Sequence, residues 1–214
     1  MIESNTYPVH LRLKRQRVLV VGGGNVAINK IAGLRRADAA VTVVAPEIRP
    51  EISGLDDVLC IQRDYARGEV ASYRMAITCT DDREVNAQVF ADGEAAGVWV
   101  NSADDPENCR FILPAVARQG DLSITISTAG RSPALATWLR RRFEREFDEK
   151  YGDLLAVLAE VRAEARTLLG TSEVRGWTEA LDDGLHFLVA TGDKEAAKDL
   201  LRKHLGLTPQ EVGS

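Results

Sequence analysis

The feature that most constrains the fold is a run of three glycines between a strand-like and a helix-like segment. Residues 18–21 (VLVV) predict a short buried strand, and Gly22, Gly23 and Gly24 follow it directly. Residues 25–36 then carry apolar side chains at helical spacing. A strand that enters a helix through a glycine turn is typical of the first unit of a doubly wound α/β sheet. We therefore expect a parallel sheet with crossover helices.

Further apolar runs continue this alternation. They predict strands over residues 41–44 (VTVV), 58–61, 75–80 (MAITCT) and 98–101 (VWVN), and a helix over residues 83–96. Strands that alternate with helices of this length imply βαβ units with right-handed crossovers. The sequence thus predicts a Rossmann-type doubly wound parallel sheet in a nucleotide-binding domain over residues 1–113.

The pattern changes near residue 114. Residues 122–127 (LSITIS) alternate apolar and polar side chains, which predicts a strand with one wet face, and Pro133 opens a helix that runs to about Phe147. We expect a strand–helix segment over residues 114–147 and a small all-helical domain over residues 148–214. Its expected features are an apolar stripe of Leu154, Leu158, Val161, Ala165 and Leu168, a helix between Asp193 and Gly206, and a capping box at Thr208–Glu211.

Composition excludes several classes of protein. Lys and Arg number 27 against 32 Asp and Glu, a net charge of −5, so the chain lacks the overall charge of a nucleic-acid binder. Its three cysteines are widely spaced, which predicts neither a disulfide framework nor a zinc site. No stretch approaches the roughly 18 to 20 apolar residues of a membrane span, and the N-terminus resembles no signal peptide. We expect a cytoplasmic protein without membrane contact.

The glycine cluster has the form of a dinucleotide-binding turn. Residues 22–27 (GGGNVA) match the pattern GxGxxA. In that pattern Gly22 allows the tight turn, Gly24 lets the backbone approach a pyrophosphate at the helix N-terminus, and Ala27 allows the helix to pack closely on the strand. A turn without a ligand is the alternative interpretation.

One part of the dinucleotide pattern is missing. An acidic residue that binds the ribose hydroxyls usually ends the second strand, but here Ala45 and Pro46 stand at that place, with Glu47 just beyond. Either Glu47 or backbone groups would then hold the ribose. Arg49 lies close enough in sequence to leave NADP open, although NAD is the preferred cofactor.

A second cluster follows the strand expected at residues 98–101. It is the segment NSADDP at residues 101–106. Together with residues 18–27 (VLVVGGGNVA), 78–82 (TCTDD), 111–116 (FILPAV) and 126–140 (ISTAGRSPALATWLR), in this order, it resembles the precorrin-2 dehydrogenase family of siroheme synthesis. That family includes stand-alone dehydrogenases, bifunctional dehydrogenase/ferrochelatases and the N-terminal part of multifunctional siroheme synthases.

The resemblance implies NAD-dependent oxidation of precorrin-2 to sirohydrochlorin. It assigns catalysis to Asp104, a carboxylate suited to accept a proton, although the adjacent Asp105 is an alternative. It also implies a set of cofactor contacts. These are Gly22, Gly23, Gly24, Asn25, Val26, Pro46, Glu47 and Thr80.

The segment ISTAGRSP implies further substrate contacts. Ser127 keeps the family's residue, whereas Thr128 and Ala129 replace its second serine and first glycine. Thr128 keeps a hydroxyl, and alanine at 129 makes an unusual backbone angle there less expected. We expect Ser127, Thr128 and Arg131 to contact the substrate, whose carboxylates suit hydroxyl and guanidinium groups, and Asp105 to contact the substrate as well. Asn101 either contacts the substrate or shapes its loop.

The resemblance also implies a homodimer built by residues 114–147, in which the partner contributes to the active-site cleft. No metal site is expected. An enzyme that also inserts Fe²⁺ is the nearest alternative function, and a dinucleotide-sensing regulatory module is a more distant one. The chain as given ends before the place where the methyltransferase of multifunctional relatives would begin, so we expect none here.

Overall fold

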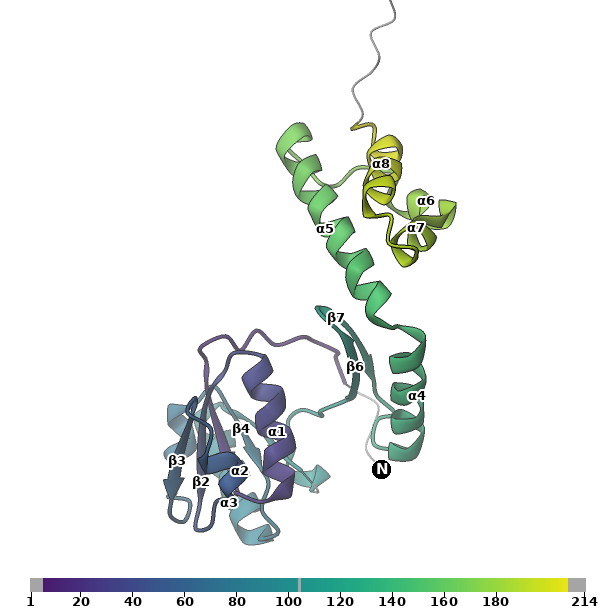
Figure 1. Ribbon diagram of the computed structural model, residues 1–214. Coiled ribbons are helices and arrows are strands. Elements are labelled where there is room, and N and C mark those ends of the chain that lie inside the picture. The colour runs from purple at the N-terminus through teal and green to yellow at the C-terminus, as the bar shows by residue number, and fades with distance from the viewer. Residues whose placement is uncertain (1–5, 104, 208–214) are drawn as a thin grey trace, which may run out of the picture. The chain divides into compact units, whose positions relative to one another are not determined.

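A parallel five-stranded sheet organises the N-terminal half of the chain in the computed structural model, which describes residues 6–103 and 105–207 (Figure 1). Its strand order is β3-β2-β1-β4-β5. In chain order the elements are β1 (Arg17–Val21), α1 (Asn25–Arg36), β2 (Ala40–Ala45), α2 (Pro50–Ser53), β3 (Val58–Gln62), η1 (Glu69–Ser72), β4 (Met75–Thr78), α3 (Arg83–Ala96), β5 (Trp99–Ser102) and η2 (Pro106–Asn108).

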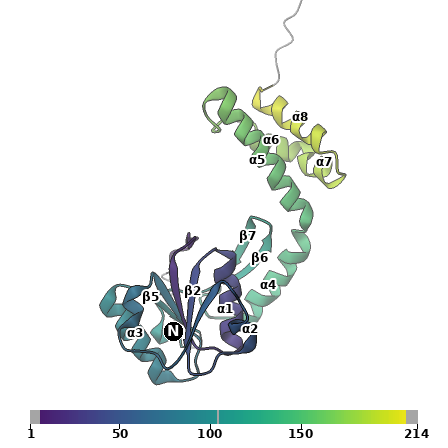
Figure 2. The same cartoon turned by 60° about the vertical axis from the view of Figure 1, so that its left-hand side comes forward.

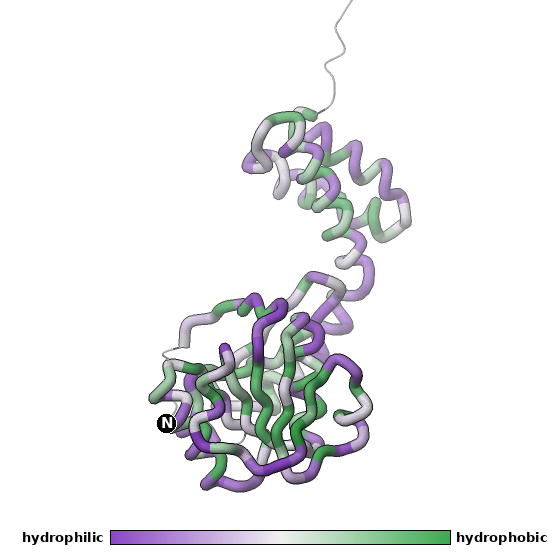
Figure 3. Tube along the Cα trace, turned by 90° about the vertical axis from the view of Figure 1, so that its left-hand side faces the viewer, coloured by the Kyte–Doolittle hydropathy of each residue, from purple (hydrophilic) through white to green (hydrophobic). Residues whose placement is uncertain are grey.

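The strands are largely apolar because helices cover both faces of the sheet. Val18 and Val20 of β1 point into a core with Ala27 and Ile31 of α1. Leu19 and Val21 point to the other face, where Val89 of α3 packs. Figure 2 shows the strands between α1 and α3, and Figure 3 shows their hydrophobic residues in the interior of this unit. The predicted α/β class with a parallel sheet is confirmed.

The predicted helices over residues 25–36 and 83–96 have the predicted bounds. The strand predicted over residues 75–80 is shorter, because β4 ends at Thr78. Cys79 and Thr80 therefore belong to the loop beyond the sheet rather than to the ladder.

The C-terminal half combines an antiparallel hairpin with helices. The hairpin joins β6 to β7, and Ala115 pairs with Ile126. The first of its strands was missed by the sequence analysis. The elements are β6 (Ala115–Gln119), β7 (Leu122–Ile126), α4 (Pro133–Glu146), α5 (Glu149–Leu169), α6 (Trp177–Ala180), the kinked turn η3 (Leu181–Leu185), α7 (His186–Ala190) and α8 (Lys194–Leu205).

Helix α5 carries the apolar stripe that the spacing predicts, with two differences. Leu154 and Val161 are buried against the other helices, and so is Val157, which the prediction omitted. Leu168, assigned to the stripe, is 61% exposed, so that assignment is wrong. Leu168 lies in the last turn of the helix, beyond this core.

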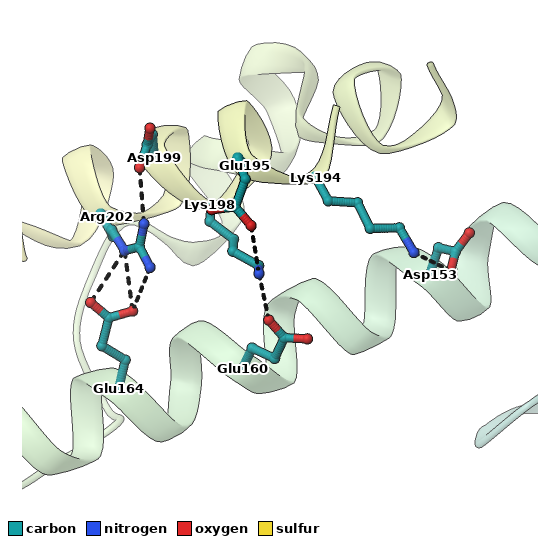
Figure 4. A network of polar contacts seen from close by, with 8 residues as sticks. All are labelled: Asp153, Glu160, Glu164, Lys194, Glu195, Lys198, Asp199 and Arg202. Atoms are coloured by element: carbon teal, nitrogen blue, oxygen red, sulfur yellow. Dashed lines mark hydrogen bonds and ion pairs between the residues drawn. The ribbon is translucent and has the colours of Figure 1, made fainter. Parts of the chain in front are cut away.

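A row of ion pairs joins α5 to α8 beside this core (Figure 4). Lys194 contacts Asp153 at 2.8 Å, Lys198 contacts Glu160 at 2.7 Å, and Arg202 contacts Glu164 at 3.1 Å. The three cations are spaced four residues apart and therefore share one face of α8. Solvent-exposed pairs of this kind stabilise a protein by about 0.2–1 kcal/mol each, so apolar packing remains the larger stabilising term.

The chain divides into two compact units, Met1–Leu113 and Pro114–Ser214. The finer boundary at residue 147 stays a prediction. The expected capping box at Thr208–Glu211 lies outside the described residues. Within the part of the chain that the structure describes, none of the helices combines the length and the apolar character that a membrane crossing requires.

Asp92 of α3 anchors the segment between β3 and β4. Its carboxylate accepts hydrogen bonds from the Tyr65 hydroxyl at 2.9 Å, the Gly68 backbone N–H at 2.6 Å and the Gln88 amide at 2.7 Å. Burial by itself would raise the pKa of Asp92, but these bonds outweigh it and lower the pKa. The carboxylate therefore stabilises the fold in its ionised form.

Asp92→Asn should lower the free energy of unfolding at pH 7 by about 1–3 kcal/mol, because charge-assisted bonds are lost. A carboxyl whose pKa is lowered by folding contributes fully above the ordinary aspartate pKa of about 3.9, and this contribution is lost as the pH falls further. The difference between wild type and variant should therefore shrink in acid. Urea unfolding at pH 7 and at pH 3 measures both values, and a constant difference would contradict the assignment.

Candidate functional site

The loops that follow β1, β2, β4 and β5 lie at one edge of the sheet, because all five strands run in parallel. The strand order reverses between β1 and β4, since the chain first builds outward to β3 and then returns to the other side of β1. Ligands of open α/β sheets bind in the crevice at such a reversal, outside the carboxyl ends of the strands. The glycine turn stands at this point.

Gly22 and Gly23 are required by their own protein neighbours. Gly22 has a φ of +115°, and a Cβ there would lie 2.6 Å from the carbonyl oxygen of Cys79. A Cβ on Gly23 would lie 2.3 Å from the carbonyl oxygen of Glu47. The Arg49 N–H donates to the Gly23 carbonyl at 3.1 Å. The turn is thus packed against the loops after β4 and β2. This packing explains why a glycine is needed at position 23, which the sequence pattern GxGxxA leaves open.

Gly24 is different, and its surroundings fit a phosphate group. Its φ is −91°, and a Cβ there would have no heavy atom within 4 Å. The first turn of α1 receives no side-chain cap and contains no acidic residue, so its N–H groups are open to an anion. Asn25 and Val26 are exposed beside it, while Ala27 is fully buried against the sheet. These residues fit the pyrophosphate of a nicotinamide dinucleotide.

The loop after β2 provides the next group of predicted contacts. Ala45 is buried at the end of the strand, whereas Pro46 and Glu47 are exposed. The Arg49 guanidinium contacts the Glu51 carboxylate, with Nη2 2.7 Å from Oε1 and Nε 3.2 Å from Oε2. This loop therefore presents one exposed carboxylate and one arginine that already has a counter-ion.

Thr80 lies in the loop after β4 and is half-buried. Its hydroxyl accepts from the Asp82 N–H at 2.9 Å, and its carbonyl accepts from the Asn86 amide at 3.0 Å. Asp82 in turn caps α3 by accepting from the Glu84 N–H at 2.9 Å. The start of α3 thus holds Thr80 in place at the strand-order reversal.

Asn101 is buried at the end of β5 and bonds within the protein. Its amide donates to the Phe111 carbonyl at 2.8 Å, which closes the loop between residues 102 and 110. Beside it the Thr78 hydroxyl donates to the Ser102 hydroxyl at 2.9 Å, joining β4 to β5. These contacts fit the loop-shaping role of Asn101.

The Cys109 thiol holds both sides of this loop, a role that the sequence analysis missed. Its sulfur accepts a hydrogen bond from the Ser102 N–H at 3.2 Å. The thiol can donate to either of two carbonyl oxygens, that of Ser102 at 3.2 Å or that of Asp105 at 3.3 Å. Burial raises the pKa of Cys109, which keeps the thiol protonated as a donor. The spacing of the cysteines in the sequence does not indicate that Cys109 holds this loop, and only the positions of its bonding partners in the structure do.

Of the two aspartates in this segment, the structure describes Asp105. The Asp105 carboxylate accepts from the Asn108 amide at 2.7 Å, and Asp105 is half-buried. Asp104, the predicted catalytic residue, lies outside the described residues.

The segment ISTAGRSP forms the turn between β7 and α4 in the C-terminal unit. Ala129 has a φ of +49° and Gly130 a φ of +73°, and the Arg131 N–H donates to the Thr128 carbonyl at 2.9 Å. The expectation that alanine disfavours an unusual backbone angle here is therefore wrong. Bonds on both sides of the turn offset the strain of a left-handed alanine, about 1–2 kcal/mol.

The hydroxyls of this turn accept from backbone groups. Ser127 Oγ accepts from the Ala129 N–H at 3.3 Å, and Thr128 Oγ1 accepts from the Ser132 N–H at 3.2 Å. An accepting hydroxyl still has its own hydrogen to donate, and Arg131 is exposed. The turn can therefore bind a carboxylate. It belongs to a different compact unit from the glycine turn and the aspartate loop.

Metal ligation has no support among the described side chains. Residues 6–103 and 105–207 contain no group of three or more His, Cys, Asp or Glu residues that could hold a metal ion.

Comparisons with known proteins agree with this geometry. Residues 9–115 match the family described as "Putative NAD(P)-binding", and residues 119–146 match the family described as "Sirohaem biosynthesis protein central". Among solved structures, "SirC, precorrin-2 dehydrogenase" matches with a TM-score of 0.72 and 26% identity, covering 92% of this chain and 100% of that chain.

Curated relatives extend the similarity over nearly the whole chain. The siroheme synthase of Thioalkalivibrio sulfidiphilus is 35% identical over 97% of this chain and 44% of its own length. The siroheme synthase of Psychrobacter arcticus is 34% identical over 97% of this chain and 39% of its own length. The chain thus spans less than half the length of these relatives.

Alanine substitutions should separate the two kinds of glycine in the turn. Gly23→Ala should destabilise the protein by about 2–4 kcal/mol, because backbone atoms block the new Cβ. Gly24→Ala has room, so it should leave the melting temperature within about 2 °C of wild type while weakening dinucleotide binding at least fivefold. Thermal unfolding and calorimetric titration with NAD⁺ measure the two effects. Unchanged NAD⁺ affinity in Gly24→Ala would contradict the phosphate assignment.

Proposed function

Because this chain belongs to the precorrin-2 dehydrogenase and siroheme synthase family, we propose that it oxidises precorrin-2 to sirohydrochlorin with a nicotinamide dinucleotide. The observation that carries the proposal is the open phosphate-binding turn at Gly24, at the same sheet edge as the loop after β5, which contains Asp105. A turn that can bind carboxylates, after β7, adds to this support. The cytoplasmic location expected from the sequence is part of the proposal.

The residues around the glycine turn would hold the cofactor. Gly24, Asn25 and Val26 would bind the pyrophosphate, Pro46 and Glu47 would contact the ribose, and Thr80 would line the site beyond β4. The nicotinamide supplies a hydride acceptor when bound. NAD is preferred over NADP, since Glu47 is an exposed carboxylate and Arg49 is ion-paired.

Oxidation of the macrocycle also releases a proton, for which we assign the Asp104 carboxylate as acceptor. The Asp105 carboxylate accepts a hydrogen bond from Asn108 at 2.7 Å, which favours its neighbour for proton transfer. Ser127, Thr128 and Arg131 would bind the substrate's carboxylates by donated hydrogen bonds and charge.

We further propose that residues 114–147 build a homodimer whose second copy completes the cleft. None of the side chains of α4 is buried, and Leu135 and Trp138 are 47% and 53% exposed. The β6–β7 hairpin has only two strands, so each of them has one edge without a partner strand in this chain. A second copy of the chain could cover the exposed apolar side chains of α4 and pair with the hairpin.

Asp104→Asn should lower kcat for NADH formation from precorrin-2 and NAD⁺ at least 100-fold, because a positioned base contributes about 10²- to 10⁴-fold. The Kd for NAD⁺ should stay within twofold, since the glycine turn is untouched. Asp56→Asn, an exposed aspartate before β3, is the matched control and should keep wild-type activity. Full turnover by Asp104→Asn would refute the catalytic assignment, and no NADH from wild type would refute the proposed function.

Light scattering should give the wild type twice the mass of one chain. Trp138→Asp should shift the protein toward monomer, because a charge would face the apolar partner surface. Phe187→Asp, at a side chain 67% exposed in α7, is the control and should leave the mass unchanged. A monomeric wild type would exclude the dimer.

A further inference from the structure

Two arginines flank the end of β2; the backbone of Arg49 bonds the dinucleotide turn, and that of Arg63 bonds β2 itself. The Arg49 N–H donates to the Gly23 carbonyl at 3.1 Å, and the Arg63 N–H donates to the carbonyl of Ala45, the last residue of β2, at 3.0 Å. In sheets of this kind the end of the second strand faces the adenosine ribose, where an arginine accommodates a 2′-phosphate. By position alone, these two cations would favour NADP.

Each arginine is already held by a glutamate. Arg49 meets Glu51 through two bonds, at 2.7 and 3.2 Å, and Arg63 meets Glu69 through two bonds, at 2.7 and 2.9 Å. Such two-point contacts use the donors with which a guanidinium would bind phosphate. The bonds from Arg49 lower the pKa of Glu51, and those from Arg63 help to lower the pKa of Glu69, so both glutamates are ionised at neutral pH.

The two pairs differ in how firmly they are held. The Glu69 side chain is only 16% exposed, and its carboxylate also accepts from the Ala66 N–H at 2.7 Å. Arg49 and Glu51 are 46% and 52% exposed, and exposed pairs of this kind are weak. Residues 47–51 and 63–69 together carry four carboxylates against three arginines, which repels a 2′-phosphate of charge about −2.

We propose that Glu51 determines the choice between NAD and NADP by holding the Arg49 guanidinium away from the 2′-phosphate of NADP. The Arg63–Glu69 pair, which is held more firmly, keeps the second guanidinium from binding that phosphate. The inference rests on the proposed dinucleotide function and deepens it. Glu51 acts through Arg49, so it is a specificity residue that need not contact NAD itself. Removing its charge frees the guanidinium and also removes one repulsive carboxylate.

The test is calorimetric titration of the full chain with NAD⁺ and with NADP⁺. Wild type should bind NAD⁺ at least tenfold more tightly than NADP⁺. Glu51→Gln should tighten NADP⁺ binding about tenfold and change NAD⁺ binding less than twofold, because the new attraction involves only the 2′-phosphate. The gain should fall as salt concentration rises.

Two further variants identify the cause. Glu51→Gln combined with Arg49→Ala should lose the gain, because the freed guanidinium is absent. Asp57→Asn releases Arg35 from a comparable exposed pair at the opposite edge of the sheet, so it should change neither affinity.

The outcomes separate the inference from the proposed function. If wild type binds neither dinucleotide, the function and the inference both fail. If NAD⁺ binds well but Glu51→Gln leaves the ratio of the two affinities within twofold of wild type, the inference alone is overturned. Equal binding of both dinucleotides by wild type, or a gain that persists without Arg49, also overturns it.

Discussion

At the end of β1, three backbone segments pass so close together that neither Gly22 nor Gly23 has room for a Cβ. The loop after β4 lies against Gly22, and the loop after β2 lies against Gly23. This packing fixes where Thr80, Glu47 and Arg49 stand relative to the start of α1. Gly24 can then remain open, because its two neighbours supply the contacts that close the turn. The geometry of the candidate cofactor site thus depends on contacts made within the protein.

Much of the N-terminal unit was predictable because its signals are local. Residues 18–21 and 41–44 are almost purely β-branched and apolar, and burial on both faces of a parallel sheet selects for that pattern. The bounds of α1 and α3 followed from the spacing of their apolar residues. Strand β6 was missed because AVARQ carries weak alternation, and it becomes a strand only through its pairing with β7.

The candidate site was less predictable, since its key contacts join distant residues. Gly23 is constrained by Glu47, and the thiol of Cys109 bonds Ser102 across a loop. A single sequence contains no signal for either contact. The expectation at Ala129 failed for a related reason, because a local preference of about 1–2 kcal/mol was outweighed by bonds on both sides of the turn.

That turn also connects the β6–β7 hairpin to helix α4 through hydrogen bonds. Thr128 accepts from the N–H of Ser132, and the Ser132 hydroxyl accepts from the Leu135 N–H at 3.2 Å in the first turn of α4. The orientation of the Thr128 hydroxyl is therefore set by where α4 begins. The start of α4 and the turn at residues 127–131 thus share one chain of hydrogen bonds, so a change in where the helix begins would also change the position of the Thr128 hydroxyl.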